Sequence, residues 1–305
     1  MKLSIEKINF HRTVRHIKEK VIEIILLLCA LSSVFITFAI VYTLIIEAVP
    51  FFKIVELKEF LTETQWTPLF ENPKYGILPL VAGTLMTTVI ALLIAIPFGM
   101  ITSVYLSEFA TSRVREIFKP LLELLAAVPT VVYGYFAMLF VTPLLQKVFP
   151  DLCAFNALSA GLVMGIMIIP YVSSLSEDAM RAVPQSLREG SLALGASKFQ
   201  TSFQVVAPSA FSGIASAFVL AISRAIGETM VVAIAAGLQP RFSFNPTDST
   251  ATLTAYIVQV SLGDLPHGSI GYQTIYVAGL TLFVFTFSLN LVGQRIRSRL
   301  EKKVK

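Results

Sequence analysis

The sequence predicts an all-α membrane protein with six transmembrane helices. Hydrophobic residues make up 55% of the 305 residues and charged residues only 14%, which is more apolar surface than a soluble chain of this length can bury. The apolar runs recur from end to end, so we expect one membrane domain. Hydropathy places the spans at about 21–49, 78–106, 121–145, 157–175, 211–238 and 272–293.

The first apolar run is too long for the hydrophobic region of a signal peptide, and no small-residue cleavage site follows it. We therefore divide the chain into a tail at 1–20, a membrane domain at 21–293 and a second, basic tail at 294–305.

Lys and Arg are distributed unevenly outside the spans. The two tails and the loops 107–120 and 176–210 hold eighteen, whereas the other three loops hold five. This bias predicts that both termini are cytoplasmic. The net charge of +5 therefore reflects membrane orientation and does not indicate a nucleic-acid partner. Cys29 and Cys153 lack the spacing of metal ligands or of a disulfide framework.

The outer loops carry two different patterns. The loop after the first span, at 51–75, mixes aromatic and acidic residues and could lie in the membrane interface as a short amphipathic helix. The loop at 239–271 is rich in turn signals and could cap the outer mouth of a pathway. A solvated connector is the alternative for each.

Proline and glycine interrupt several spans. Pro97 lies late in the second, Pro129 early in the third, and Gly161 and Gly165 in the fourth. Transporters use such breaks, but ordinary packing of membrane helices uses them too and is the favoured interpretation.

The fifth span contains the charged segment 223–229, which reads Ser-Arg-Ala-Ile-Gly-Glu-Thr. Arg224 lies near the middle of the span, and we expect Glu228 one turn further along the same helix face. A charge at that depth costs about 3 kcal/mol, so it normally faces protein or water. The segment is therefore a candidate path for an anion that also donates a hydrogen bond.

The loop at 177–208 has the pattern of a hairpin of two short helices. Pro184 is placed to begin the first helix and Gly195 to end it, and a second helix at about 198–206 would be stopped by Pro208. Its exposed apolar side chains would need a partner groove.

This loop resembles the coupling-helix motif of ABC importer permeases, in which Glu-Ala-Ala, three residues, Gly, nine residues and Ile-x-Leu-Pro follow one another. Glu189, Gly190, Ser191 and Gly195 keep every spacing, and Val-Val-Ala-Pro at 205–208 ends on Pro208. The resemblance implies that this loop docks onto an ATPase, with Arg188 and Glu189 contacting the ATPase or bracing the hairpin. Solvated charge of little energetic weight is the alternative for these two residues.

Three further segments resemble the phosphate-specific ABC transporter permeases. They are Val-Pro-Thr-Val-Val-Tyr-Gly at 128–134, Ser-Arg-Ala-Ile-Gly-Glu-Thr-Met at 223–230 and Thr-Ala-Tyr-Ile-Val-Gln-Val at 254–260. The methionine at 230 and the loop 262–268 favour the PstC-type subunit over the PstA-type. The resemblance implies a type I ABC importer permease architecture in a prokaryotic inner or plasma membrane.

It also implies partners outside this chain: a PstA-type permease, two PstB-type ATPase subunits and a PstS-type phosphate-binding protein. The chain has no Gly-x-x-x-x-Gly-Lys-Ser/Thr loop, so we expect no catalytic residues and no cofactor in it, with ATP and Mg bound by the ATPase.

For the path, we hypothesise that Arg224 offers its guanidinium fork to phosphate, while Glu228 holds Arg224 and accepts the proton of a protonated phosphate oxygen. Ser223 and Thr229 are candidate hydroxyl donors, although such residues often bond their own backbone. The alternative is a structural Arg224–Glu228 ion pair that locks the helix to a neighbour.

Other function classes stay open on sequence alone. One is an ABC importer of another oxyanion or solute, which the hairpin would equally permit. The other is a channel, secondary carrier or membrane scaffold without an ATPase.

Overall fold

The computed structural model describes residues 2–263, 265–266 and 268–304, with side chains for residues 16, 18–263, 265–266 and 268–295. The positions 264 and 267 of the 262–268 loop lie outside the described residues. Within them the chain forms helices and isolated β-bridges but no strand, so the all-α prediction is confirmed. In chain order the longer helices are α1 (Lys2–Phe52), α3 (Leu78–Val104), α4 (Ser112–Ala127), α7 (Ala157–Arg181), α11 (Phe211–Ile226) and α14 (Ile270–Val304).

Short elements connect them. These are α2 (Leu57–Thr62), the π-helical turn η1 (Tyr105–Phe109), α5 (Thr130–Phe136), η2 (Ala137–Val141), α6 (Thr142–Gln146), α8 (Gln185–Ala193), α9 (Lys198–Thr201), η3 (Ser202–Val206), α10 (Ala207–Ser209), α12 (Met230–Ala235) and α13 (Leu253–Ser261).

Among the described residues, four helices are long and apolar enough to cross a membrane, and six spans result if each of two bent helix pairs counts as one. The third predicted span is such a pair, because α4 and α5 meet at an 85° bend where Pro129 stands. The fourth continues to Arg181, so residues 177–181, which the sequence placed in the loop, belong to α7.

The centre of the bundle is the pair α3 and α7, which lie side by side. Small residues allow this approach: a Cβ at Gly165 would stand 2.8 Å from the carbonyl oxygen of Ala91, and one at Gly161 would stand 2.7 Å from the Cβ of Ile90. These two glycines therefore serve close helix packing, one of the two interpretations of the sequence.

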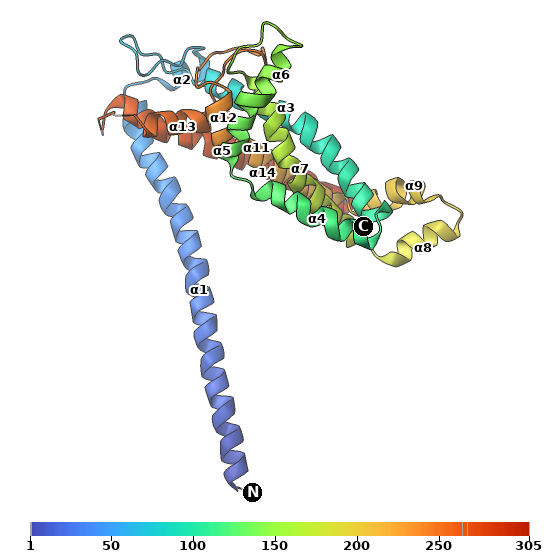
Figure 1. Cartoon of the computed structure of the whole chain (residues 1–305). Helices are drawn as coiled ribbons and strands as arrows, with labels where there is room; N and C mark the ends of the chain where they lie inside the picture. The colour runs from blue at the N-terminus through green and yellow to red at the C-terminus, as the bar shows by residue number, and fades with distance from the viewer. Residues whose placement is uncertain (1, 264, 267, 305) are drawn as a thin grey trace.

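The helix α1 diverges from the rest of the molecule (Figure 1) and contacts it mainly through α14, where Gly279 lies against Leu44. Its apolar side chains between Val21 and Val49 are mostly exposed. Surface of this kind and extent must be covered by lipid or by another protein.

The loops at one end of the bundle, at 53–77, 147–156 and 236–252, pack on one another; we call this the loop end. Gln65 bridges to Arg241, and the amide N–H of Cys153 donates to the Thr247 carbonyl at 3.2 Å. Phe51, Phe60 and Trp66 are buried in an edge-to-face cluster, so these aromatic residues form a core, which neither the interfacial helix nor the solvated connector considered for this loop anticipated.

The fifth predicted loop is more ordered than its turn signals indicated. It contains α13, whose residues Ala255 and Tyr256 are buried, so this segment belongs to the bundle and is not a solvated connector. A tight turn directly before this loop, at Gly237 with φ of +101°, lies within the predicted fifth span, and Gly237 bridges to Thr250 of the loop.

The other end of the bundle carries α8 and α9, which project from it (Figure 1); we call this the hairpin end. The helix α8 begins directly after Pro184, and Gly195 adopts a φ of +84° between the two helices, as predicted. The prediction that Pro208 stops the second helix is wrong. Pro208 lies in the first turn of α10, where its missing N–H costs nothing, and the chain turns by 72° only after Ser209.

Candidate functional site

The helix of the fifth predicted span is broken at the charged segment. α11 ends at Ile226, Gly227 follows it, and α12 starts at Met230. The expectation of one continuous helix over 211–238, with Arg224 and Glu228 on one face, is therefore wrong. Gly227 and the side-chain bonds of Glu228 described below favour the break over continuation of the helix.

Arg224 and Glu228 nevertheless meet across this break. Arg224 Nη1 donates to Glu228 Oε2 at 2.7 Å. The carboxylate is almost fully buried at 2% exposed, whereas the guanidinium side chain is 33% exposed. Apart from this bond, no hydrogen bond of Arg224 side-chain N–H groups to described residues is found. The guanidinium thus keeps donors for a ligand.

The second oxygen of Glu228 caps the helix that follows. Glu228 Oε1 accepts from the backbone N–H of Met230 at 3.2 Å and of Val231 at 3.3 Å. These are amide groups at the start of α12 that have no partner within the helix. One carboxylate therefore fixes both the arginine on α11 and the direction of α12.

The segments that carry the family resemblance converge on this break. Thr254 on α13 donates through its hydroxyl to the carbonyl oxygen of Glu228 at 2.7 Å. Gly134 on α5 lies against α12, since a Cβ there would stand 2.9 Å from Ile234 Cδ1 and 3.1 Å from the Met230 carbonyl oxygen. Residues 128–134, 223–230 and 254–260 thus form one connected structure around Glu228.

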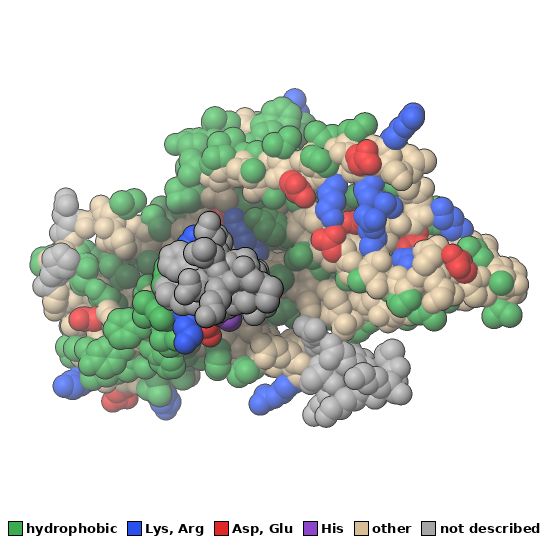
Figure 2. Space-filling view, turned by 90° about the horizontal axis from the view of Figure 1, so that it is seen from below, with side chains coloured by type: hydrophobic (Ala, Val, Ile, Leu, Met, Phe, Trp, Pro, Cys, Tyr) green, Lys and Arg blue, Asp and Glu red, His purple; other side chains and the backbone are tan. Residues whose placement is uncertain are grey.

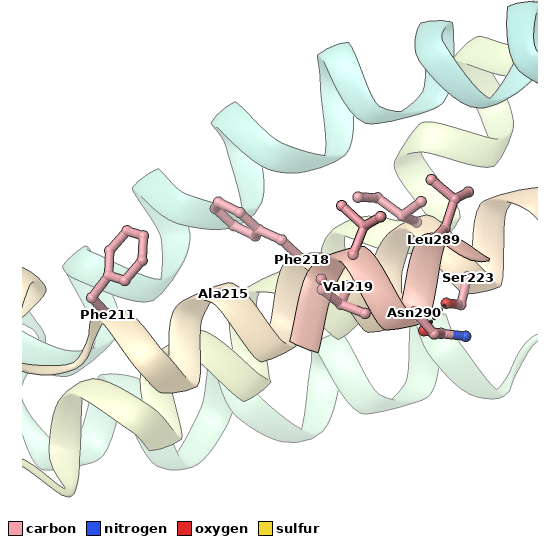
Figure 3. A pocket seen from close by; sticks show the side chains of 10 residues that line it. Phe211, Ala215, Phe218, Val219, Ser223, Leu289 and Asn290 are labelled. Carbon is pink, nitrogen blue, oxygen red and sulfur yellow. Dashed lines mark hydrogen bonds between the residues drawn. The ribbon is translucent and has the colours of Figure 1, made fainter. Parts of the chain in front are cut away.

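Ser223 points toward α14 (Figure 3). Its hydroxyl donates to Asn290 Oδ1 at 3.1 Å, and both residues line an apolar groove of about 290 Å³ between α11 and α14. Sequence reasoning missed Asn290, although an asparagine between two leucines of a membrane span was a visible signal.

Thr229 lies inside the break and is partly buried. Its hydroxyl donates to the carbonyl oxygen of Gly227 at 3.3 Å. Both hydroxyl candidates therefore bond protein groups in this conformation.

The hairpin residues divide into braced and exposed ones. Arg188 donates from Nη2 to Glu108 Oε1 at 2.9 Å and from Nη1 to the carbonyl oxygen of Val183 at 2.6 Å. Because its side chain is only 13% exposed, Arg188 braces the hairpin against η1. Glu189 is exposed and free for a partner.

Two other residues of the motif lie on the hairpin. The Ser191 hydroxyl pairs with the Thr201 hydroxyl at 2.9 Å and joins α8 to α9. A Cβ at Gly190 would have no atom within 4 Å, so this side of α8 is open to contact with another protein. Pro208 lies at the base of the hairpin.

A second set of charged residues, which sequence reasoning missed, surrounds Glu177 on α7. This carboxylate is 1% exposed and pairs with Arg115 at 3.6 Å and Lys119 at 2.8 Å, both on α4, and with Arg181 at 3.5 Å. Figure 2 shows basic and acidic side chains gathered on the side of the molecule where the hairpin lies. The pairings of Glu177 with Arg115 and Lys119 join residues about 60 positions apart, so they leave no local pattern in the sequence.

Comparison with known proteins identifies the family. The profile of the binding-protein-dependent transport system inner membrane component matches residues 95–305. The chain belongs to this family. It is therefore a multi-pass inner-membrane component of a transport system that depends on a binding protein, in line with the motif of the hairpin.

Similar proteins are found along most of the chain. It is 33% identical to a probable ABC transporter permease protein, YqgH, of Bacillus subtilis (strain 168), over 96% of each chain. It is 31% identical to the phosphate transport system permease protein PstC of Xylella fastidiosa (strain 9a5c), over 80% of each chain.

Solved structures show the same fold at low sequence identity. A chain of the bacterial alginate ABC transporter superposes with a TM-score of 0.62 at 18% identity, covering 90% of this chain and 94% of its own length. A chain of the MetNI methionine ABC transporter, in an inward-facing conformation, gives a TM-score of 0.54 at 16% identity, covering 74% of this chain and 94% of its own. The predicted type I ABC importer permease architecture is confirmed.

Proposed function

We propose that this chain is the permease subunit of an ATP-driven importer of inorganic phosphate. The observation that carries the proposal is the broken helix at 227–229, where a partly exposed arginine keeps free N–H donors beside a buried carboxylate. The names of relatives such as PstC, the phosphate transport system permease, support phosphate as the substrate.

Arg224 is the residue proposed to contact phosphate. A guanidinium presents a planar fork of donors that matches two phosphate oxygens, and charge-assisted bonds of this kind are about twice as strong as neutral ones. The 33% exposure of the side chain permits such contact.

Glu228 is proposed to position Arg224. The sequence suggested in addition that its carboxylate accepts a proton from phosphate. In this conformation that carboxylate is 2% exposed and already accepts from Arg224, Met230 and Val231. A fixed guanidinium loses less side-chain entropy when it binds an anion, so the positioning role alone aids transport.

The hairpin is proposed to dock on the ATPase. Leu194 at its tip is 91% exposed, and Phe199 is 62% exposed, with its ring tilted against that of Phe203 and the ring centroids 4.6 Å apart. Exposed apolar groups on a projecting hairpin fit a groove of a partner protein. Arg188 would transmit the movement of the hairpin to η1 and so to α3.

The partners of the assembly are proposed from the PstC relatives: a PstA-type permease, two PstB-type ATPase subunits and an extracytoplasmic PstS-type phosphate-binding protein. ATP and Mg would be bound by the ATPase, and this chain would contribute no catalytic residue. The distribution of Lys and Arg supports an orientation with both termini and the hairpin end in the cytoplasm.

The test is uptake of radiolabelled phosphate into vesicles that contain this chain with its partner permease, ATPase and binding protein. ATP-dependent uptake that arsenate blocks and sulfate does not is the expected result. If the assembled complex hydrolyses ATP but takes up no phosphate, phosphate is not the substrate, and the chain would be an ABC permease for another solute.

A further inference from the structure

A polar pocket lies beneath the hairpin, outside the path described above. Its volume is about 420 Å³. Residues from η1, α4, α7, α8 and α9 line it: Ser107, Glu108, Ala110, Arg115, Arg181, Gln185, Arg188, Leu192, Lys198 and Thr201. The pocket thus spans the joint between the hairpin and the bundle.

Basic side chains outnumber acidic ones in this lining. The lining contains one carboxylate, that of Glu108, and four basic side chains: Arg115, Arg181, Arg188 and Lys198. Even with the neighbouring Glu177 included, which pairs with Arg115 and Arg181, positive charge exceeds negative. The pocket therefore favours an anion.

Two of these cations are already committed to structure. Arg188 donates to Glu108 and to the carbonyl oxygens of Val183 and Met180. Arg115 donates to the carbonyl oxygen of Leu106 through Nε at 2.9 Å and Nη2 at 2.8 Å.

The other two keep donors for a ligand. Arg181 makes one 3.5 Å ion pair through Nη1, and its side chain is 51% exposed. The Lys198 ammonium lies 5.3 Å from the centroid of the Phe109 ring, a contact that uses charge but no N–H donor on an oxygen. Arg181 ends α7 and Lys198 begins α9, so a ligand with several oxygens can bond both elements at once.

We propose that this pocket binds a phosphate group and that the bound group ties the hairpin to α7. Phosphate offers several acceptor oxygens and up to two negative charges, which suits an arginine, a lysine and the Gln185 amide that line one pocket from different elements. Its source is free phosphate or the headgroup of an anionic lipid, because the pocket lies at the end of membrane-spanning helices. A hairpin tied in this way is held more firmly to α7, so occupancy strengthens the link through which movement of the hairpin reaches the spans.

The effect on transport rests on the proposed function, but binding itself does not. Binding of radiolabelled phosphate is therefore measured with the assembled complex lacking the binding protein, in nanodiscs of neutral phosphatidylcholine at fixed ionic strength. The background is Arg224→Lys, which removes the fork proposed for the path. The test variant is Arg181→Gln with Lys198→Gln; the control is Lys58→Gln with Lys147→Gln, two exposed lysines at the loop end.

We expect the test pair to weaken phosphate binding at least about tenfold and the control pair to leave it unchanged. A lipid source is tested in nanodiscs that contain phosphatidylglycerol, by counting retained lipids in native mass spectrometry. Loss of one retained phosphatidylglycerol in the test pair, without free-phosphate binding, would assign the pocket to the headgroup.

If the test pair changes neither phosphate binding nor lipid retention, the proposal is overturned. Loss of the ATPase from the complex with phosphate binding intact would also overturn it, because the pocket would then be a docking surface for the ATPase. If the double variant does not assemble, the single variant Lys198→Met, at an exposed position, gives the same comparison.

Discussion

Replacement of Arg188 by alanine should lower the free energy of unfolding far more than is usual for a residue on a projecting hairpin. The substitution removes the bonds from Nε and Nη2 to Glu108, at 3.2 and 2.9 Å, and those to the carbonyl oxygens of Val183 and Met180, at 2.6 and 2.8 Å. Glu108, whose side chain is 6% exposed, then keeps only the Ser107 hydroxyl bonded to its carboxylate.

The expected magnitude follows from this burial. Removing one partner of a buried ion pair costs about 3–5 kcal/mol, because the other charge stays buried without its hydrogen-bonded partner. We therefore expect Arg188→Ala to lower the free energy of unfolding by about 3–5 kcal/mol, and Glu108→Gln to lower it by about 1–3 kcal/mol, since the amide oxygen still accepts. Unfolding of the purified chain by SDS, followed by circular dichroism, measures both.

The neighbouring Glu189 provides the control, because its side chain is exposed. Glu189→Ala should change stability by less than about 0.5 kcal/mol. The combination Glu108→Leu with Arg188→Met leaves no buried charge at this pair and should be more stable than Arg188→Ala alone. If Arg188→Ala is as stable as Glu189→Ala, the hairpin is not braced as described.

Three further predictions concern single side chains. Glu228→Gln should reduce phosphate uptake about tenfold, because a neutral amide holds Arg224 less firmly than a carboxylate does; an unchanged uptake rate would refute the positioning role. Gly195→Val, at a φ of +84°, should strain the hairpin by about 1–3 kcal/mol and uncouple ATP hydrolysis from phosphate uptake. The control Gly190→Ala, within α8 and with open space around it, should leave ATP hydrolysis coupled to uptake. Equal coupling in the two variants would contradict the role of the turn. Ser223→Ala should leave phosphate uptake within about twofold of the unmodified protein. It should lower the free energy of unfolding by about 1 kcal/mol, because the Ser223 hydroxyl donates to Asn290. A large loss of uptake at normal stability would instead place Ser223 in the phosphate path.

Features with a local cause were predictable from the sequence. Hydropathy located the long apolar helices α1, α3, α7 and α14, because about twenty apolar residues are needed to cross a bilayer. Gly195 was expected at the end of α8, and its positive φ bears this out. The contact of Arg224 with Glu228 was also expected, since the two are four residues apart.

Features with a long-range cause were not predictable. The sequence suggested a continuous fifth helix because its hydropathy continues past Gly227, whereas the helix stops where Glu228 caps α12 and Thr254 bonds the Glu228 carbonyl. Glu108 and Arg188 are 80 residues apart. No periodicity links such residues, so only the packed structure shows that Arg188 braces the hairpin.

The most direct test of the proposed function compares phosphate uptake by the unmodified chain and by Arg224→Lys in the complete complex, at equal amounts of complex in the vesicles. Lysine keeps the charge but loses the fork of donors. We expect ATP hydrolysis to continue and phosphate uptake to fall at least about tenfold. Uptake at the unmodified rate would contradict the account, because Arg224 would then act only through its charge beside Glu228.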